Sequence, residues 1–482
     1  MISKIGLSTV LIASLAVSIN AKTYSQADMD KVLQRLDRLE KALEIQQEQT
    51  TIKINKTNIK MQKIQASNEE EIEALNERAD ENEFHATMNR IKWGGEFEVS
   101  DNYVEGKTGS IPQFGMTGTE YSDNNKWTTK VRLSMEAKIN DKTKFSGRLA
   151  MYKNWSDSSG ANISDSAEGR KPSGGSGLYV ERAYVDYSFS DVLTMTIGRQ
   201  PSSDGPGMTL IENTQRKATY PSLLFDGAAD GLVLSAKLPT ILNLKPTIRL
   251  AYGKGFQNQA NYTPYEANTM AIEDLNVYGA FLEMNLPFKS MGDNLLVFSY
   301  VKGTDFIGHP QQFSTPSTNS NLGDMDLAGI YFENNKAFGT KLSYFASIGW
   351  NMPDSNAKTV TLRDANGNNM PPMALIKDNG SAFHIGARYD FNNSFKLGYE
   401  FNHGSKNWFS FTSGSSDLLN KLATRGDVND IYAIYQIDLN QFIRLGYTMI
   451  DYDYTGSGWH IGTSMKTDDY VNRAYGVYNL RF

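Results

Sequence analysis

The sequence predicts an all-β protein, an antiparallel up-and-down barrel of about 16 strands preceded by an α-helical coiled coil. In short segments such as 127–139, apolar side chains alternate with Thr, Lys, Arg, Ser and Glu, and a period of two places the two sets on opposite faces of a strand. The connections between these segments alternate between long and short. The long connections are expected at 105–126, 154–177, 200–228, 254–273, 303–322, 351–380, 404–427 and 454–471.

The difference between the two sets of connections indicates where the barrel lies. Outer-membrane barrels have long loops at one rim, tight turns at the other and an even number of strands. A soluble β-sandwich also has alternating strands, but it does not normally keep the long and short rhythm over so many hairpins. The 25 Tyr, 23 Phe and 6 Trp residues suit the aromatic girdles of such barrels. We therefore expect a barrel over 89–482, surrounded by outer-membrane lipid.

The first 21 residues have the features of a secretory signal peptide. Lys4 precedes an apolar run from Ile5 to Ile19, and the small residue Ala21 precedes Lys22. This run is shorter than the roughly 20 residues that a membrane-spanning helix needs, which argues against an anchor. We expect residues 1–21 to be removed after export.

Residues 22–88 are expected to form a helix, because Tyr24–Met88 contains neither Gly nor Pro. A heptad pattern of apolar residues begins with Val32, Leu36, Leu39 and Leu43. Asn residues interrupt the later heptads, and a polar residue at a core position can set the oligomeric state. One interpretation is a periplasmic coiled coil that joins protomers into a homo-oligomer, with a trimer as a candidate. The alternatives are a solvated helix against the barrel and a weakly ordered linker.

Composition and motifs argue against several other functions. The net charge of −6 leaves no basic footprint, so nucleic acid is not an expected partner. The absence of cysteine excludes disulfides, thiol catalysis and cysteine metal sites. The five histidines are scattered, and the calcium-like start at Asp364 has Asn369 where Gly is needed and Leu375 where Glu is needed. We expect no cofactor, no metal and no catalytic residues.

The final strand segment, Asn472–Phe482, carries a more specific pattern. Tyr478, Leu480 and Phe482 share one face with Ala474 and Gly476. Such a strand resembles the signal by which the barrel-assembly machinery recognises outer-membrane proteins, so this machinery is an expected partner.

From Ile91 to Phe482 the chain resembles Gram-negative porins. It is most similar to a porin-like family of unknown function in which a coiled coil precedes the barrel, and the motif TIGRQ at Thr196–Gln200 is similar to porin strand ends. The resemblance implies passive diffusion of small hydrophilic solutes and ions through the lumen, usually in trimers, and no enzymatic activity.

The third long loop, 200–228, differs from the other loops. Asn154–Gly177 is rich in Ser, Asn, Gly and Asp, whereas Gly205–Ala228 contains Met, Leu, Ile and Phe residues that need a packing surface. In porins the third loop folds into the barrel and narrows it, and the resemblance implies the same here. The alternatives are a loop that packs over the rim or against a neighbouring protomer.

Strand parity places Arg132, Arg148 and Arg182 on the lumen side of the second, third and fourth strands. The resemblance implies a basic wall opposite acidic groups of the loop, and such opposed charges create a field that orients solutes and selects ions. The loop offers both signs, so the ion preference stays open, as does the alternative that these are ordinary solvated lumen positions. The loop residues assigned to this constriction are Glu212, Arg216, Lys217 and Asp226.

Three classes of function follow from the sequence. The first is a passive pore, the second a barrel enzyme such as a protease or lipase, and the third a structural or adhesive protein of the outer membrane. Single-channel conductance discriminates best among them, because only the pore gives steady open steps.

Overall fold

The computed structural model describes residues 26–89, 91–155, 177–200, 205–216, 218–227, 229–241, 244–256, 273–287, 293–307, 320–363, 367–412 and 417–482. The expected signal peptide and Lys217 lie outside these residues. The chain divides into two units, Met1–Met88 and Asn89–Phe482, which are described separately.

The first unit contains one long helix, α2, over Gln26–Asn89. Its 64 residues span about 96 Å at the rise of an α-helix. The helix forms because the segment is rich in Glu, Gln, Lys and Leu, which favour helices, and lacks Gly and Pro. Every side chain described over 27–80 is exposed, including the heptad residues Val32, Leu36, Leu39 and Leu43.

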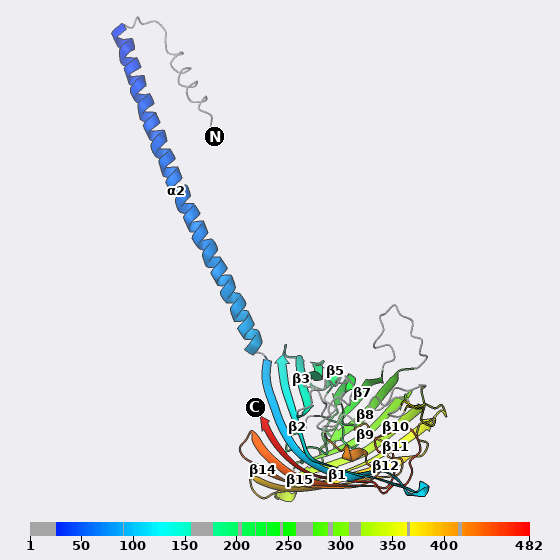
Figure 1. Ribbon diagram of the computed structural model, residues 1–482. Helices are drawn as coiled ribbons and strands as arrows, with labels where there is room; N and C mark the ends of the chain where they lie inside the picture. The colour runs from blue at the N-terminus through cyan, green and yellow to red at the C-terminus, as the bar shows by residue number, and fades with distance from the viewer. Residues whose placement is uncertain are drawn as a thin grey trace. The chain divides into compact units, whose positions relative to one another are not determined.

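The second unit is a closed barrel of sixteen strands in which each strand pairs antiparallel with its neighbours in sequence, and β1 pairs with β16 (Figure 1). The predicted fold class is confirmed. The strands are β1 Ile91–Ile111, β2 Met116–Lys138, β3 Thr143–Asn154, β4 Tyr179–Ser188, β5 Leu193–Gln200, β6 Ala229–Lys237, β7 Thr247–Phe256, β8 Leu275–Met284, β9 Asp293–Thr304, β10 Gly323–Asn335, β11 Leu342–Ser355, β12 Gly380–Asp390, β13 Phe395–Gly404, β14 Gly426–Gln436, β15 Gln441–Tyr452 and β16 Tyr470–Arg481; short 3-10 helices are η1 Pro112–Phe114, η3 Ala337–Gly339 and η4 Lys421–Ala423.

The first hairpin differs from its prediction. The segment 105–126, expected to be a long loop, continues β1 and β2 with Lys107 opposite Glu120 and Ile111 opposite Met116. Thr117, Thr119 and Tyr121 occupy alternate positions there, and Thr and Tyr favour strands even where no apolar alternation is present. The alternation of apolar residues alone therefore does not predict this extension.

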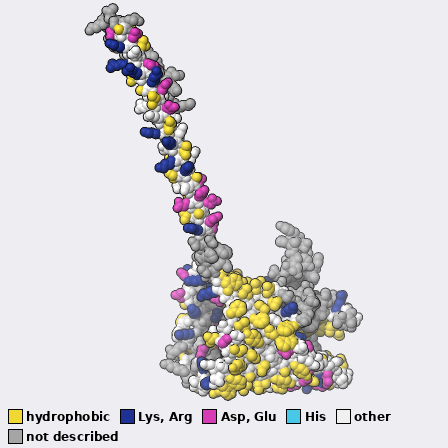
Figure 2. Space-filling model, turned by 60° about the vertical axis from the view of Figure 1, so that its left-hand side comes forward, with side chains coloured by type: hydrophobic (Ala, Val, Ile, Leu, Met, Phe, Trp, Pro, Cys, Tyr) yellow, Lys and Arg dark blue, Asp and Glu magenta, His cyan; other side chains and the backbone are white. Residues whose placement is uncertain are grey.

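The two faces of the barrel wall differ in chemistry. Large apolar side chains such as Leu133, Leu250, Leu397 and Leu445 are exposed on the outer face, and they cover much of the wall in the view of Figure 2. The alternate residues point inward and include many charged side chains that are buried inside the barrel. An apolar outer band with a polar interior is the arrangement that lipid around a barrel requires.

The apolar core lies inside the barrel and under its loops. One cluster joins inward residues of β8–β10 to residues of four long connections, and we call the described parts of these connections (305–307, 320–322, 356–363, 367–379, 405–412, 417–425 and 453–469) the loop lid. The buried residues that the lid contributes to this cluster are Phe306, Leu322, Val360, Leu362, Leu375, Ile376, Phe409 and Ile461.

Candidate functional site

The third long connection runs from β5 to the inner face of the far wall; its described parts, 205–216 and 218–227, are called the inserted loop. Cationic side chains of four distant strands hold this loop, three of them through its backbone carbonyls and one through the Asn213 side chain. Arg388 of β12 donates to the carbonyl of Leu210 at 2.8 Å, and Arg481 of β16 donates to that of Glu212 at 2.9 Å. Because these carbonyls belong to neighbouring residues, the wall fixes the whole turn. The remaining bonds are Arg444 to the Ile211 carbonyl, Arg481 to the Asn213 carbonyl at 2.9 Å and Lys396 to Asn213 Oδ1 at 2.7 Å.

Asn213 makes this turn sterically accessible. Its φ of 48° lies in the left-handed region, which Asn tolerates better than most residues. Its side-chain amide also donates to Gln436 Oε1 at 2.8 Å, so both ends of the side chain are bonded to the wall. The sequence therefore supplies the turn and its anchor in a single residue.

The apolar residues of the inserted loop pack against the inner face of β9–β15. Leu223 and Leu224 are buried beside Trp408, Tyr432 and Phe442. The wall makes room for them with glycine: a Cβ at Gly329 would lie 2.6 Å from a Leu224 methyl group, and one at Gly349 would lie 2.9 Å from the other. These residues explain why the loop is apolar, since its side chains form a core rather than a solvated surface.

The described parts of a second connection, 405–412 and 417–425, also pack within the barrel, and Phe411 pairs with the inserted loop. Phe225 and Phe411 form a parallel β-bridge, and the Asp226 amide donates to the Phe411 carbonyl at 2.8 Å. Lys421 of η4 lies 2.8 Å from both Glu400 and Asp430 of the strand wall. The two connections therefore close one side of the lumen as a single packed body.

A small space remains between these two connections and the strands β1–β3 and β14–β16. We call this space the constriction cavity, and its volume of about 60 Å³ is that of about two water molecules in the liquid. Its lining residues include Glu98, Lys130, Tyr152, Met208, Ile211, Glu212, Asp417, Lys421, Asp430, Arg444, Arg473 and Tyr475.

Each cation of the constriction cavity faces an acid. Arg444 lies 3.4 Å from Glu212, and Arg473 lies 3.6 Å from Asp417. Lys130 lies 2.9 Å from Glu98, and Lys421 pairs with Asp430. Four cations and four acids give the lining no net charge. The cavity is therefore polar and balanced, with local fields between its opposed charges.

The arginines singled out from the sequence lie elsewhere on the wall. Arg132 is 3.0 Å from both Glu96 and Glu181, and Arg148 pairs with Glu181. Arg182 lies opposite Arg148 in the register. All three arginines are buried, and none of them lines the constriction cavity.

A β-bulge in β4 explains the position of Glu181. The register shifts between Arg148 and Leu149, so the adjacent residues Glu181 and Arg182 are both buried. Strand parity assigns neighbours to opposite faces and could not place both inside.

The predicted loop residues are separated in space. Glu212 lines the constriction cavity, whereas Arg216 lies 3.0 Å from Glu283 of β8. Although burial opposes it, the hydrogen bond that Arg216 donates to Glu283 raises the pKa of Arg216. Asp226 is buried at the bridge between the two connections.

The residues assigned to assembly lie where the barrel closes. Phe482 donates its amide to the Gly95 carbonyl at 3.1 Å, and the Gly95 amide donates to Phe482 at 2.7 Å. The Phe482 side chain is 72% exposed, and Tyr478 donates its hydroxyl to Gln441 at 2.7 Å.

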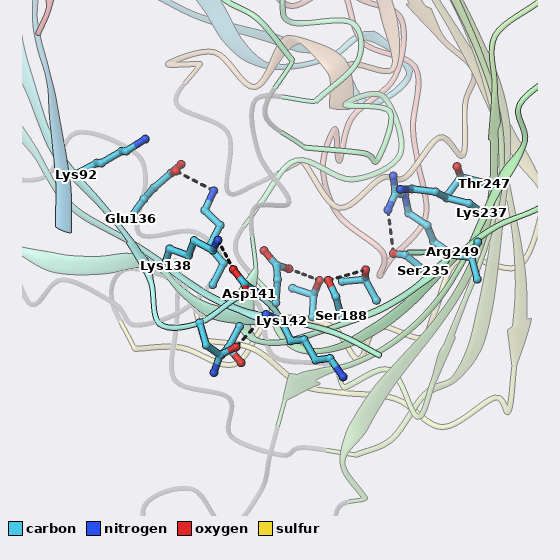
Figure 3. A pocket seen from close by; sticks show the side chains of 17 residues that line it. Lys92, Glu136, Lys138, Asp141, Lys142, Ser188, Ser235, Lys237, Thr247 and Arg249 are labelled. Atoms are coloured by element: carbon cyan, nitrogen blue, oxygen red, sulfur yellow. Dashed lines mark hydrogen bonds and ion pairs between the residues drawn. The ribbon is translucent and has the colours of Figure 1, made fainter. Parts of the chain in front are cut away.

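A larger cavity of about 690 Å³ opens at the turn end of β1–β7, and Figure 3 shows the side chains that line it. We call it the basic vestibule. Its basic residues are Lys92, Lys138, Lys142, Lys144, Lys237 and Arg249, and its acidic residues are Glu136, Asp141 and Asp186.

The sequence model of the family described as "Protein of unknown function (DUF3373)" matches residues 120–479. The chain belongs to this family. The match covers most of the barrel, which confirms the expected resemblance to a porin-like family of unknown function. No curated protein matches the chain.

Among solved structures, the chain is similar to one described as "Salmonella typhi OmpF complex with Daunomycin". The identity is 12% and the TM-score 0.43, over 81% of this chain and 97% of that chain.

Two features are absent from the described residues of this family member. None of its helices there is long and apolar enough to cross a membrane. No group of three or more His, Asp or Glu side chains there could hold a metal ion.

Several residues of the site were missed from the sequence. Lys396, Arg444, Arg473 and Arg481 occupy inward positions on their strands, and strand parity could have found them. The second connection carries its own signal in the aromatic residues Trp408, Phe409 and Phe411, which resemble the apolar residues of the inserted loop more than those of a solvated loop.

Proposed function

We propose that the protein is a porin of the outer membrane that lets small hydrophilic solutes and ions diffuse through a lumen narrowed by loop 200–228. The observation that carries this proposal is the inserted loop, which reaches from β5 to arginines of β12, β15 and β16 within a closed barrel. A loop held at its tip narrows a lumen permanently. No reaction is required, because passage follows the solute gradient.

The charged residues give this pore its selectivity. We assign that role to Arg132, Arg148 and Arg182 on the wall and to Glu212, Arg216, Lys217 and Asp226 of the loop. Local fields between opposed charges orient dipolar solutes even where the net charge is zero. The size of the constriction cavity favours small permeants over large ones.

The test is conductance of the purified protein in a planar bilayer. We expect small, steady open steps, and larger steps when residues 208–211 are replaced by two glycines, because their side chains fill the lumen. Loops carry no ladder bonds of the barrel, so the variant should keep its heat-modifiable mobility. The second candidate, a structural or adhesive protein, is favoured by the packed loop lid. A bilayer that shows no conductance with either the parent or the 208–211 variant would support it.

We propose that the long connections face the outside and the turns the periplasm, after removal of a signal peptide over 1–21. The chain has no cysteine, so a single introduced cysteine labels uniquely. Cysteine at Lys377, in an exposed part of the loop lid, should react on intact cells, whereas cysteine at Asp191 in a turn should not. The opposite labelling would reverse the orientation.

We propose that 22–88 forms a periplasmic coiled coil between protomers, with a trimer as the oligomer. The support is the row of exposed apolar residues on α2, which a partner helix would bury. Deleting Asp28–Asn82 should dissociate the oligomer on native gels while the barrel stays folded. Unchanged oligomer mobility would assign the helix another role.

We propose that Tyr478, Leu480 and Phe482 form the strand signal read by the barrel-assembly machinery. Phe482 is mostly exposed and pairs with Gly95 where the barrel closes. Phe482→Ser should reduce barrel insertion while export across the inner membrane continues. The measure is the fraction of heat-modifiable protein in outer-membrane fractions, and an unchanged fraction would remove the assignment.

A further inference from the structure

We propose that the basic vestibule binds small solutes that carry two or more oxyanion charges, such as pyrophosphate. The proposal deepens the porin function and rests on it for the role of the site in permeation. Binding itself is a separate property of the cavity and can be measured without current.

The vestibule carries a local excess of positive charge. Six basic and three acidic side chains line the cavity, so its net charge is 6 − 3 = +3. The whole chain has a net charge of −6. The excess of cations is therefore a local feature and not a reflection of composition.

Each acidic side chain of the cavity already has a partner. Lys138 lies 2.6 Å from Asp141, and Lys144 lies 2.8 Å from Glu136, so two of the acids are used. The third acid, Asp186, accepts a hydrogen bond from the Thr196 hydroxyl at 2.6 Å. The acids of the cavity thus form ion pairs with Lys138 and Lys144 and with none of its other cations.

The remaining cations keep most of their charge available. Lys92 and Lys142 form no ion pair with any residue that the structure describes. Lys237 donates to the neutral carbonyl of Asp191 at 3.1 Å. Arg249 donates to Ser235 at 2.9 Å and shares Glu283 with Arg216. An anion in the vestibule would therefore gain partners without displacing acids from Lys92, Lys142 or Lys237.

The shape and chemistry of the cavity also suit a small polyanion. Lys92 and Lys138 lie on one side of the vestibule, and Lys237 and Arg249 lie on the other, with Asp141, Lys142 and Ser188 between them (Figure 3). Hydroxyl groups of Ser and Thr line the same cavity and add hydrogen-bond donors. Charge-assisted bonds to phosphate oxygens are short and strong. A volume of about 690 Å³ admits a small polyanion with its hydration water.

Barrel walls also strengthen the attraction. A cleft of one sign of charge with low-dielectric walls concentrates counter-ions. At physiological salt the screening length is about 8 Å, so the attraction acts within the vestibule and not far outside it. A multivalent anion is attracted more strongly than chloride, because each of its charges can face a separate cation.

The experiment measures pyrophosphate binding by ³¹P line broadening with the purified full-length protein in detergent. The test variant is Lys92→Gln with Lys142→Gln. The matched control is Lys245→Gln with Lys336→Gln, which removes the same charge from exposed turn residues outside the vestibule. Heat-modifiable mobility confirms that all three proteins are folded.

We expect the parent and the control to bind equally. The test variant should bind about 25-fold more weakly, about fivefold for each lysine, which is the effect of one unit charge at contact in a water-like medium. Absence of binding by the parent, or equal binding by the test variant, overturns the proposal.

Bilayer currents separate this proposal from the porin function. Pyrophosphate added at the turn side should reduce the current through the parent more than through the test variant. A conducting barrel that does not bind pyrophosphate removes the vestibule site and keeps the pore. Binding by a protein that leaves the bilayer sealed removes the pore and keeps the site.

Discussion

The two halves of the barrel have inner faces of different chemistry. Along β9–β15 the inward face carries large apolar residues, for example Val297, Leu327, Tyr331 and Phe345, beside paired charges on β12–β15, and the inserted loop and the loop lid cover it. Along β1–β7 the inward residues are largely charged or hydroxylated, and the basic vestibule opens beside them. Apolar inward side chains need a cover that excludes water, whereas a charged wall is compatible with water. The position of the loops therefore follows from the strands, and the larger cavity lies in the polar half.

The largest expected effect comes from the covered half. Trp408 is fully buried and donates its indole N–H to the Leu422 carbonyl at 2.9 Å. Trp408→Ala should lower the free energy of unfolding by about 3–5 kcal/mol, because it creates a cavity and leaves that carbonyl without its donor. Urea unfolding in detergent measures the change.

Trp93→Ala is the matched control, since Trp93 is half exposed on the outer face of β1. Trp93→Ala should lower the free energy of unfolding far less than Trp408→Ala. Equal losses would mean that the cover over β9–β15 does not stabilise the barrel.

The second effect concerns the charged half. Glu181 lies between Arg132 and Arg148, and Glu181→Gln removes the charge that both arginines face. Breaking a buried pair costs about 3–5 kcal/mol, so we expect a loss of about 3 kcal/mol. In a salt gradient the reversal potential should also move toward anion preference.

Glu136→Gln is the control for this variant. Glu136 pairs with Lys144 at 2.8 Å, but both side chains are about half exposed, and such pairs contribute about 0–1 kcal/mol. If Glu181→Gln and Glu136→Gln lower stability equally, the buried ion pairs of Glu181 stabilise the barrel no more than an exposed pair does.

The structures of the two halves could not be predicted equally well from the sequence. Alternation and the rhythm of connections predicted the strands, and the apolar residues of Gly205–Ala228 marked that loop as unusual. The partner of Glu212 could not be predicted, because Arg444 is more than 200 residues away and no local pattern joins them. Glu181 was missed for a different reason, since a bulge breaks the parity on which the inward assignment depends.

The third effect concerns the joint between the covered half and its lid. Arg425 is buried and donates to the carbonyls of Trp408 at 3.0 Å, Thr455 at 3.0 Å and Trp459 at 2.6 Å. Burial lowers the pKa of Arg425 to about 10, which still leaves it charged at neutral pH. Arg425→Lys keeps the charge but loses the planar fork that reaches several carbonyls.

We expect Arg425→Lys to open the lid locally at a cost of about 2 kcal/mol, the scale of a hydrogen bond from a charged group. The readout is limited proteolysis, with new cleavage in 405–425 and 453–469 while the barrel stays heat-modifiable. Arg363→Lys, at an exposed lid position, is the control. An unchanged digestion pattern in the Arg425 variant would show that apolar packing alone closes the lid.

The smallest effect is a pH dependence of the same lid. His460 lies edge-on against Phe306 and Phe409, with ring centroids 5.3 and 5.5 Å away, and its Nε2 lies 2.8 Å from the Ile307 carbonyl. Burial lowers the pKa of His460 below its ordinary value in the closed lid. In an open lid the imidazole would titrate near its usual pKa of about 6.5.

The open state therefore gains a proton first as the pH falls. Above about pH 6.5 both states are neutral and the closed lid keeps its full stability; below that pH, opening is favoured by at most about tenfold per pH unit. Proteolysis of the lid between pH 7.5 and 5.0 should increase accordingly in the parent. His460→Gln keeps a donor for the Ile307 carbonyl but does not titrate, so its cleavage should change little with pH. If the variant and the parent respond alike, the acid sensitivity of the lid arises from other groups, and the apolar contacts of His460 serve packing alone.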